Sequence, residues 1–135
     1  MRVMMCLIGG ALIATAPIVT ALPAQAAARV EPEARLTKRL EGRVAGKPVN
    51  CIPQYRIQSS EIFEKTAILY KAGSTWYLNR PVSGRNFLGR DDILLTDTHS
   101  SDLCSVDIVR LLDQGSHFPS GSLGLGQFVP YTKKD

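Results

Sequence analysis

The densest group of polar side chains in this chain is the run Asp97-Thr98-His99-Ser100-Ser101-Asp102. Two carboxylates flank an imidazole here, and such groups can orient a general base or hold a divalent cation. Asp, Ser and Thr also favour turns, because their side chains hydrogen-bond to the neighbouring backbone. We interpret the run as a solvated turn, and we keep Asp97, His99 and Asp102 as a weak polar cluster.

Serine and histidine side chains also occur in combinations that nucleophilic catalysis uses. The strained turn that presents a nucleophilic serine requires Gly-x-Ser-x-Gly between a strand and a helix. The glycine-rich stretch of residues 120–126 does not supply this pattern. We therefore assign no catalytic residue to the candidates, which are Ser116, Ser120 and Ser122 with His99 or His117.

Paired carboxylates such as Glu61 and Glu64 can do acid–base work, as in glycosidases. On a solvated β surface such residues are more often simply charged, so this pair is not assigned a role either. An enzyme is therefore the less favoured class for this chain.

No metal or cofactor site is predicted. The aspartates between residues 91 and 107 lack the alternating oxygen ligands and central glycine of a calcium loop. Zinc would need more Cys or His ligands at close spacing. Residues 120–126 also match neither the dinucleotide-binding nor the Walker glycine pattern.

The amino-terminal segment has the pattern of an export signal. Arg2 is followed by an uncharged run from Val3 to Ala24, and small-x-small sites lie at residues 24–26 and 26–28. This order is typical of a secretory signal peptide. We predict residues 1–26 as the signal peptide and cleavage after Ala26, with an uncleaved membrane anchor as the alternative. The mature protein would then be periplasmic or secreted, without stable membrane insertion.

Removal of the signal would leave two cysteines, Cys51 and Cys104, because Cys6 lies in the removed segment. An even pair in an oxidising compartment predicts a disulfide. A redox pair would have Cys-x-x-Cys spacing, which is absent. We expect a structural bond, with both sulfurs directed into the core because Ile52 and Leu103 are their neighbours.

Charge argues against nucleic acid as a partner. The segment after residue 26 has 15 basic and 12 acidic residues, a formal charge of +3. These charges are interleaved, without a dense basic cluster carrying aromatic residues, so the electrostatic footprint of a nucleic-acid binder is missing.

Apolar residues recur every four positions at Leu36, Leu40 and Val44, which predicts an amphipathic helix over residues 31–44. Pro32 suits its first turn, and Gly46 and Pro48 supply a stop. We assign residues 27–47 to this helix or a leader, and residues 48–135 to a β domain. A helix of this length needs a surface to dock on.

After Pro48 the chain consists of short runs rich in Val, Ile, Tyr and Thr, separated by turn residues, which indicates antiparallel strands. The clearest hairpin joins residues 66–71 and 75–79 through Ala72-Gly73-Ser74. Its predicted buried residues are Ala67, Leu69, Trp76 and Leu78, with Asn79 nearer water. Residues 81–92 and 113–126 are predicted as loops. The other predicted strands are 54–58, 93–96 and 106–112, with a further one at 127–131.

The segments around Cys51-Ile52, residues 64–70 and 76–79, and Leu103-Cys104-Ser105-Val106-Asp107 together resemble small exported bacterial proteins of unknown function. The resemblance covers roughly residues 48–112. It implies export and a disulfide-stapled β domain, but it transfers no site.

We therefore expect a mainly β fold, either a small antiparallel sheet or a partly open barrel, with one amino-terminal amphipathic helix. The favoured function is a non-catalytic envelope or binding module whose partner is a protein or an envelope component. The alternatives are an inhibitor of a secreted hydrolase, which would present residues 115–126, and a small hydrolase or metal-dependent enzyme.

Overall fold

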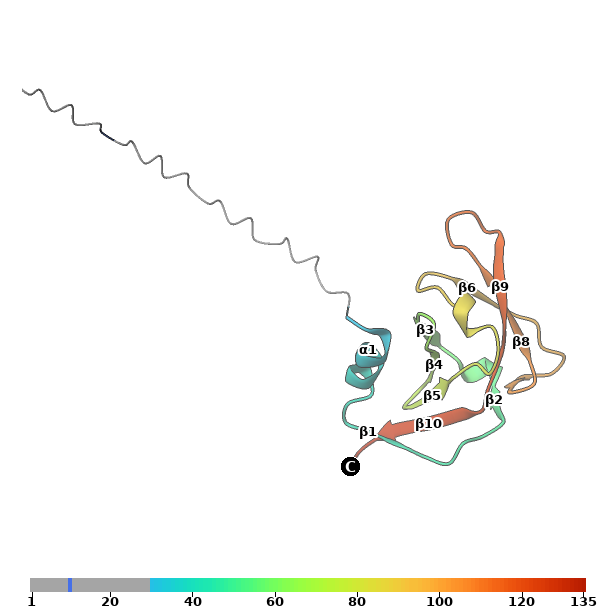
Figure 1. Cartoon of the computed structure of the whole chain (residues 1–135). Helices are drawn as coiled ribbons and strands as arrows, with labels where there is room; N and C mark the ends of the chain where they lie inside the picture. The colour runs from blue at the N-terminus through green and yellow to red at the C-terminus, as the bar shows by residue number, and fades with distance from the viewer. Residues whose placement is uncertain (1–9, 11–29) are drawn as a thin grey trace, which may run out of the picture.

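The fold is mainly β, with one short helix at its amino-terminal side (Figure 1). The computed structural model describes residue 10 and residues 30–135, so the predicted signal peptide, apart from residue 10, lies outside the described residues. Two short 3₁₀ turns, η1 (Gln54–Arg56) and η2 (Arg85–Phe87), interrupt the strands. The helix and strands are α1 (Pro32–Arg39), β1 (Arg43–Ala45), β2 (Cys51–Pro53), β3 (Ser59–Phe63), β4 (Ala67–Ala72), β5 (Thr75–Asn79), β6 (Ile93–Thr96), β7 (Asp102–Cys104), β8 (Ile108–Leu112), β9 (Pro119–Gly124) and β10 (Phe128–Lys133).

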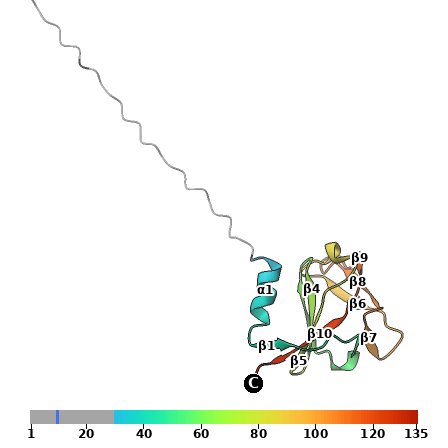
Figure 2. The same cartoon turned by 60° about the horizontal axis from the view of Figure 1, so that its bottom comes forward.

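The strands form three small antiparallel sheets that do not close into a barrel. The largest has the order β1-β10-β5-β4-β3, the second pairs β2 with β7, and the third has the order β6-β8-β9. In both views α1 lies on one side of the five-stranded sheet, and β8 and β9 lie on the other side (Figures 1 and 2). The five-stranded sheet is therefore the middle layer of the molecule.

Strand β4 is buried on both faces, which explains why its sequence is apolar at consecutive positions. Ala67 and Leu69 face α1, together with Leu36 of the helix. Ile68 and Tyr70 face the opposite way, into the larger core that the other two sheets complete. Alternation along the strand thus divides the interior into two cores, one on each side of the middle sheet.

The helix is shorter than its apolar period predicted, and it ends at Arg39 instead of Val44. The Arg43 amide closes a turn on the Leu40 carbonyl, and Arg43–Ala45 then pairs with β10 as strand β1. Pairing satisfies the backbone of this segment, so tertiary structure overrides the helical pattern there. The helix packs on the face of the sheet that carries Ala67, Leu69, Trp76 and Leu78, the residues predicted to share a buried face.

The predicted hairpin is confirmed, and Gly73 has the positive φ that the turn was expected to need. Ala72 already pairs with Thr75, so only Gly73 and Ser74 lie between the strands. The predicted strand at residues 54–58 is wrong, because Gln54–Arg56 forms a 3₁₀ turn. The strand follows at Ser59–Phe63, where the exposed and polar start of an edge strand masks the β pattern.

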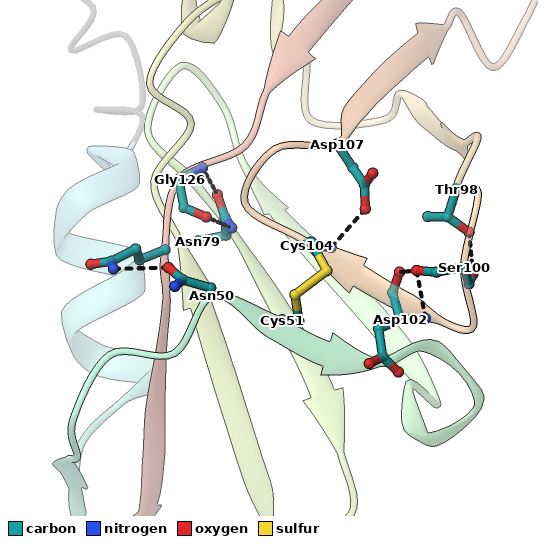
Figure 3. The surroundings of a disulfide bond; sticks show 10 residues. Asn50, Cys51, Asn79, Thr98, Ser100, Asp102, Cys104, Asp107 and Gly126 are labelled. Atoms are coloured by element: carbon teal, nitrogen blue, oxygen red, sulfur yellow. Dashed lines mark hydrogen bonds between the residues drawn. A yellow bond between two sulfur atoms is a disulfide. The ribbon is translucent and has the colours of Figure 1, made fainter.

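Asn79 is fully buried, not near water as predicted. Its side-chain amide donates to the Gly126 carbonyl at 2.7 Å, and its Oδ1 accepts from the Gly126 amide at 3.0 Å (Figure 3). These two bonds satisfy the backbone of Gly126 just before β10 begins. Burial of a polar side chain is tolerated because both of its polar atoms are paired.

Part of the predicted loop at residues 113–126 is strand β9, which pairs with β8. Glycines within residues 121–126 let the segment of residues 80–87 pack closely against this part of the chain. A Cβ at Gly121 would lie 2.6 Å from the Phe87 Cβ. A Cβ at Gly126 would lie 2.5 Å from the Arg80 carbonyl oxygen. Because glycine has no side chain, β9 shows no alternating apolar pattern in the sequence, and the same lack of a side chain is what the close packing requires.

Candidate functional site

Strands β6 and β8 carry exposed apolar side chains on the face turned away from the core. We call this the outer face and define it by Ile93, Leu95, Ile108 and Arg110, with Leu112 half-buried beside them. The register places Leu95 opposite Arg110, and Ile93 opposite Leu112. Ile108 is 59% exposed, and Val106, just before β8, is 85% exposed.

The outer face is apolar because two paired strands are apolar at consecutive positions. Leu94, Val109 and Leu111 alternate with the outer-face residues and pack into the larger core. An antiparallel sheet with one solvated face normally carries polar residues on that face. Strands that are apolar on both faces are typical of a sheet that is covered on both sides, and exposed apolar patches mark interaction surfaces.

A hollow of about 300 Å³ lies at one end of the outer face, and the predicted polar cluster contributes to it. Asp97 and His99 line the hollow together with Arg110, whose guanidinium lies 3.9 Å from the Asp97 carboxylate. Asp102 is not one of its lining residues. The structure therefore brings Asp97 and His99 together with a cation, and it places Asp102 elsewhere.

The segment between β6 and β7 is a bend held by its own polar side chains. The Thr98 hydroxyl donates to the Ser100 carbonyl at 3.0 Å, and the Ser100 hydroxyl donates to the Asp102 carbonyl at 3.0 Å (Figure 3). These are the local contacts that stabilise turns. Among the residues that the structure describes, no group of three His, Cys, Asp or Glu side chains could hold a metal ion.

Cys51 and Cys104 form a disulfide across the β2–β7 pair, where they lie directly opposite each other (Figure 3). The predicted direction of the sulfurs is wrong: Cys51 is exposed and Cys104 is half-buried. Side chains alternate along a strand, so the burial of Ile52 and Leu103 turns the adjacent cysteines to the opposite face. The bond therefore staples the two strands from the surface.

Glu61 and Glu64, the carboxylates considered for acid–base chemistry, bind cations instead. Glu61 accepts from Arg39 of α1 at 2.8 Å and pairs with Lys71 at 3.2 Å. Glu64 pairs with Arg35 of α1, and with Arg90 at 3.0 Å. Both carboxylates thus connect α1 or the 81–92 segment to the edge of the middle sheet.

The pKa of each of these two carboxyl groups is lower than usual. Partial burial opposes the lowering, but hydrogen bonds from Arg39 to Glu61 and from Arg90 to Glu64 outweigh it. A general acid near neutral pH needs a raised pKa, so neither group is tuned for that role.

The loop between β8 and β9 is shaped by Asp113. Its carboxylate accepts from the amides of Gly115 and Ser116 at 3.0 and 2.8 Å, and from the Ser116 hydroxyl at 2.9 Å. The Ser116 hydroxyl therefore bonds to a carboxylate, and not to a histidine. His117 has a positive φ, and Phe118 beside it is 72% exposed. Ser120 and Ser122, the other serine candidates, are exposed on β9.

The sequence predicted β6 with its observed bounds and β8 within a strand that was expected to begin at Val106, but it did not predict the outer face. The available signal was the run of apolar residues in both strands, Ile93-Leu94-Leu95 and Ile108-Val109. That pattern shows that both faces of each strand are apolar. It does not show that the two strands are neighbours, or that one face stays open.

No helix among the described residues is both long enough and apolar enough to cross a membrane. The resemblance to small exported proteins implied a disulfide-stapled β domain, and the structure contains one. No protein-family model, no curated protein and no solved structure matches this chain.

Proposed function

We propose that this chain is an exported, non-catalytic binding module that contacts a partner protein through the outer face of β6 and β8. The observation that carries the proposal is the exposure of Ile93, Leu95 and Ile108 on one face of a small sheet. Apolar surface left in water raises the free energy of the isolated protein by roughly 25 cal/mol per Å². A partner that covers this surface would gain that free energy as affinity.

Export is supported by two separate features. The amino-terminal segment has the order of charges, apolar residues and small-x-small sites that a signal peptidase recognises. The Cys51–Cys104 disulfide belongs to the kind that persists in oxidising compartments. The proposed location is the periplasm or the medium, and the mature chain is proposed to start at or near Ala27.

Amino-terminal sequencing of protein from the producing cells tests export. A mature chain that begins within a few residues of Ala27 supports it. Recovery of chain that starts at Met1 from the membrane fraction would show that the segment is an anchor.

Binding through the outer face is tested by placing a photoreactive amino acid at Ile108 in the producing cells. We expect one discrete cross-linked protein at this position. Gln58, which is exposed and lies before β3, is the matched control position and should give none. A second probe at Val106 reports on the effect of substituting Ile108: Ile108→Thr should abolish cross-linking from Val106. The same substitution should change the free energy of unfolding by about 0.5 kcal/mol or less, because Ile108 is exposed. The same pattern of products at Ile108 and Gln58 would contradict the proposal.

A second candidate function, inhibition of a secreted hydrolase, is favoured by the β8–β9 loop. Binding is tighter when a loop is held in its bound conformation beforehand. Hydrogen bonds from the Ser116 amide and hydroxyl and from the Gly115 amide lower the pKa of Asp113, which indicates that its ionised form holds the loop. The exposed Phe118 is the side chain that such a loop would insert into a cleft.

Substitutions in the β8–β9 loop and on the outer face distinguish the two candidate functions. If the chain is an inhibitor, Phe118→Ala and Asp113→Asn should each weaken inhibition of the target hydrolase, and Ile108→Thr should not. If the outer face is the binding surface, only Ile108→Thr should weaken partner binding.

A further inference from the structure

We propose that strand β6 binds an extended segment of the partner as an added strand, and that this segment has an uncharged β-forming centre with Lys or Arg at both ends. This inference rests on the proposed binding function and names the recognition mode and the chemistry of the partner. Its support comes from the position of β6 in its sheet and from the charges at the two ends of the strand.

Strand β6 is an edge strand, because β8 is the only strand with which it pairs in the described part of the chain. An edge strand presents backbone amides and carbonyls that a further strand can pair with. The sequence Ile93-Leu94-Leu95-Thr96 contains no charge and no proline, which are the devices that normally protect an edge. Its exposed side chains, Ile93 and Leu95, belong to the outer face.

Strand β3, one of the two edge strands of the middle sheet, shows how an edge looks when it is protected. Strand β3 carries Glu61 at its centre, and Arg39 of α1 donates to that carboxylate at 2.8 Å. The helix thereby lies against this edge, and Lys71 of β4 adds a second cation at 3.2 Å. Strand β6 has no charge of its own and no comparable ion pair.

Both ends of β6 are acidic. Asp91 and Asp92 precede the strand and Asp97 follows it, and the carboxylates of Asp91 and Asp97 are exposed. One carboxylate oxygen of Asp92 already accepts a hydrogen bond from the Gly89 amide, at 2.7 Å. The Arg110 guanidinium lies 3.9 Å from the Asp97 carboxylate, and this pair is open to solvent. A strand aligned with β6 would therefore bring its own two ends against carboxylates, which favour Lys or Arg there.

The same charges disfavour a second copy of this chain as the occupant. Two copies of β6 pairing antiparallel with full overlap would place Ile93 opposite Thr96, and hence Asp92 opposite Asp97 at both ends. Like charges directly opposite each other destabilise a strand pair. A basic-ended segment of another protein meets no such repulsion.

The test uses three capped synthetic peptides and the folded, disulfide-bonded protein. The first has the sequence Lys-Thr-Val-Thr-Val-Thr-Lys, which spans residues 91–97 and places both Lys side chains on the face that carries Asp91 and Asp97. The second has Glu at both ends, and the third is the first with methyl groups on alternate backbone nitrogens, made in both registers. Binding is followed by amide chemical shifts and by slowed amide exchange within residues 93–96. We expect the Lys-ended peptide to bind roughly tenfold more tightly than the Glu-ended one, since two exposed ion pairs contribute. N-methylation in one register should abolish binding.

The charge variants decide whether the ends of β6 select the peptide. The double variant Asp91→Lys with Asp97→Lys should reverse the preference between the two peptides. Glu41→Lys with Asp135→Lys changes the net charge equally at exposed positions elsewhere, and it should leave the preference unchanged. If the lysine variant does not fold, Asp91→Asn with Asp97→Asn should remove the preference.

Other outcomes would overturn this inference. Equal binding of both N-methylated peptides and the unmethylated peptide, or no slowed exchange in residues 93–96, would mean that the edge is not used. Concentration-dependent dimerisation with protection of residues 93–96 would make a second copy the occupant. In either case a cross-linked partner at Ile108 would still support the outer face, whereas loss of that product alone would remove the proposed function.

Discussion

At the scale of single residues, the Asn79 side chain supplies the hydrogen bonds that a neighbouring strand would otherwise give to the backbone of Gly126. Its side chain pairs with both the amide and the carbonyl of Gly126, in the tight passage between β9 and β10. A hydrogen-bonding side chain at this buried position lets the backbone leave one sheet and begin a strand in another without unpaired polar groups.

Substitution of Asn79 by alanine should therefore be costly. The variant leaves the buried amide and carbonyl of Gly126 unpaired, and we expect the free energy of unfolding to fall by about 2 to 4 kcal/mol. Chemical denaturation measures this. Asn86→Ala, at an exposed position in η2, is the control and should change stability by about 0.5 kcal/mol or less. Equal effects of the two substitutions would refute the role given to Asn79.

Gly84 is required for a different reason. It has a φ of 73°, and a Cβ there would lie 2.0 Å from the Ser122 carbonyl oxygen of β9. Alanine at this position would have to adopt a strained backbone and to displace β9, so Gly84→Ala should destabilise the protein by about 2 kcal/mol or more. Gly115→Ala is the matched control, because the nearest atom to its Cβ would be Asp113 Oδ1 at 3.4 Å, an ordinary contact. A thermal melt of each variant gives the comparison, and a wild-type melting temperature for Gly84→Ala would contradict it.

At the scale of elements, α1 is held to the middle sheet by Leu36 in the smaller core and by ion pairs around it. Glu33 in its first turn binds Arg80 through both oxygens, at 2.6 and 3.1 Å. An eight-residue helix is marginal alone, so these tertiary contacts account for its stability.

Docking of α1 should weaken in acid. A hydrogen bond from Arg80 lowers the pKa of Glu33, and the pKa values of Glu61 and Glu64 are lowered as described above. Because the folded pKa values lie below the unfolded ones, their contribution is complete above the unfolded pKa of about 4.3 and is lost as the pH falls through the folded values. Amide exchange of α1 should therefore accelerate below about pH 4.

The matching substitution is Glu64→Gln, which removes the carboxylate shared by Arg35 and Arg90. It should lower stability at pH 7 by roughly 1 kcal/mol, because the pairs are partly exposed, and it should reduce the acid dependence of α1. Glu41→Gln, at an exposed site after the helix, is the control. Unchanged acid dependence in Glu64→Gln would show that other groups govern docking.

At the scale of the whole molecule, the disulfide joins two strands 53 residues apart in the chain. It lies at the surface, and Ile52 and Leu103 beside it are buried independently of the bond. The folded state therefore does not need the sulfur atoms for its packing. Their effect falls mainly on the unfolded chain, whose entropy the cross-link restricts.

Reduction of Cys51–Cys104 should lower the free energy of unfolding by about 4 kcal/mol on the loop-closure model, while the β structure persists at low temperature. Because Cys51 is exposed, mild reductant should reach the bond without unfolding the protein. Circular dichroism with and without reductant, and Cys51→Ser with Cys104→Ser, measure this. A protein that loses its β signal at low temperature on reduction would show that the bond is needed for the fold itself.

The sequence by itself determined the local features of this protein. The positions of β5 and β6, the Gly73 hairpin, the start of α1 at Pro32 and the pairing of two cysteines all follow from residues a few positions apart or from counting. These features depend on backbone preference, strand period and thiol chemistry, which act over short distances in the chain. The helical period could predict α1 but not its end, because β10, about 90 residues further along, captures Arg43–Ala45.

Only the tertiary structure decided which faces are covered. Strand β9 could not be predicted, because its glycines have no side chains that would show an alternating pattern. Asn79 was predicted to face water, because its hydrogen-bond partner is a backbone group 47 residues away in the chain. The disulfide lies at the surface because Ile52 and Leu103, the neighbours of the two cysteines, point into the core. The outer face exists for the same reason: Ile93, Leu95 and Ile108 are apolar in the sequence, but the order in which the sheets stack leaves them without a covering layer.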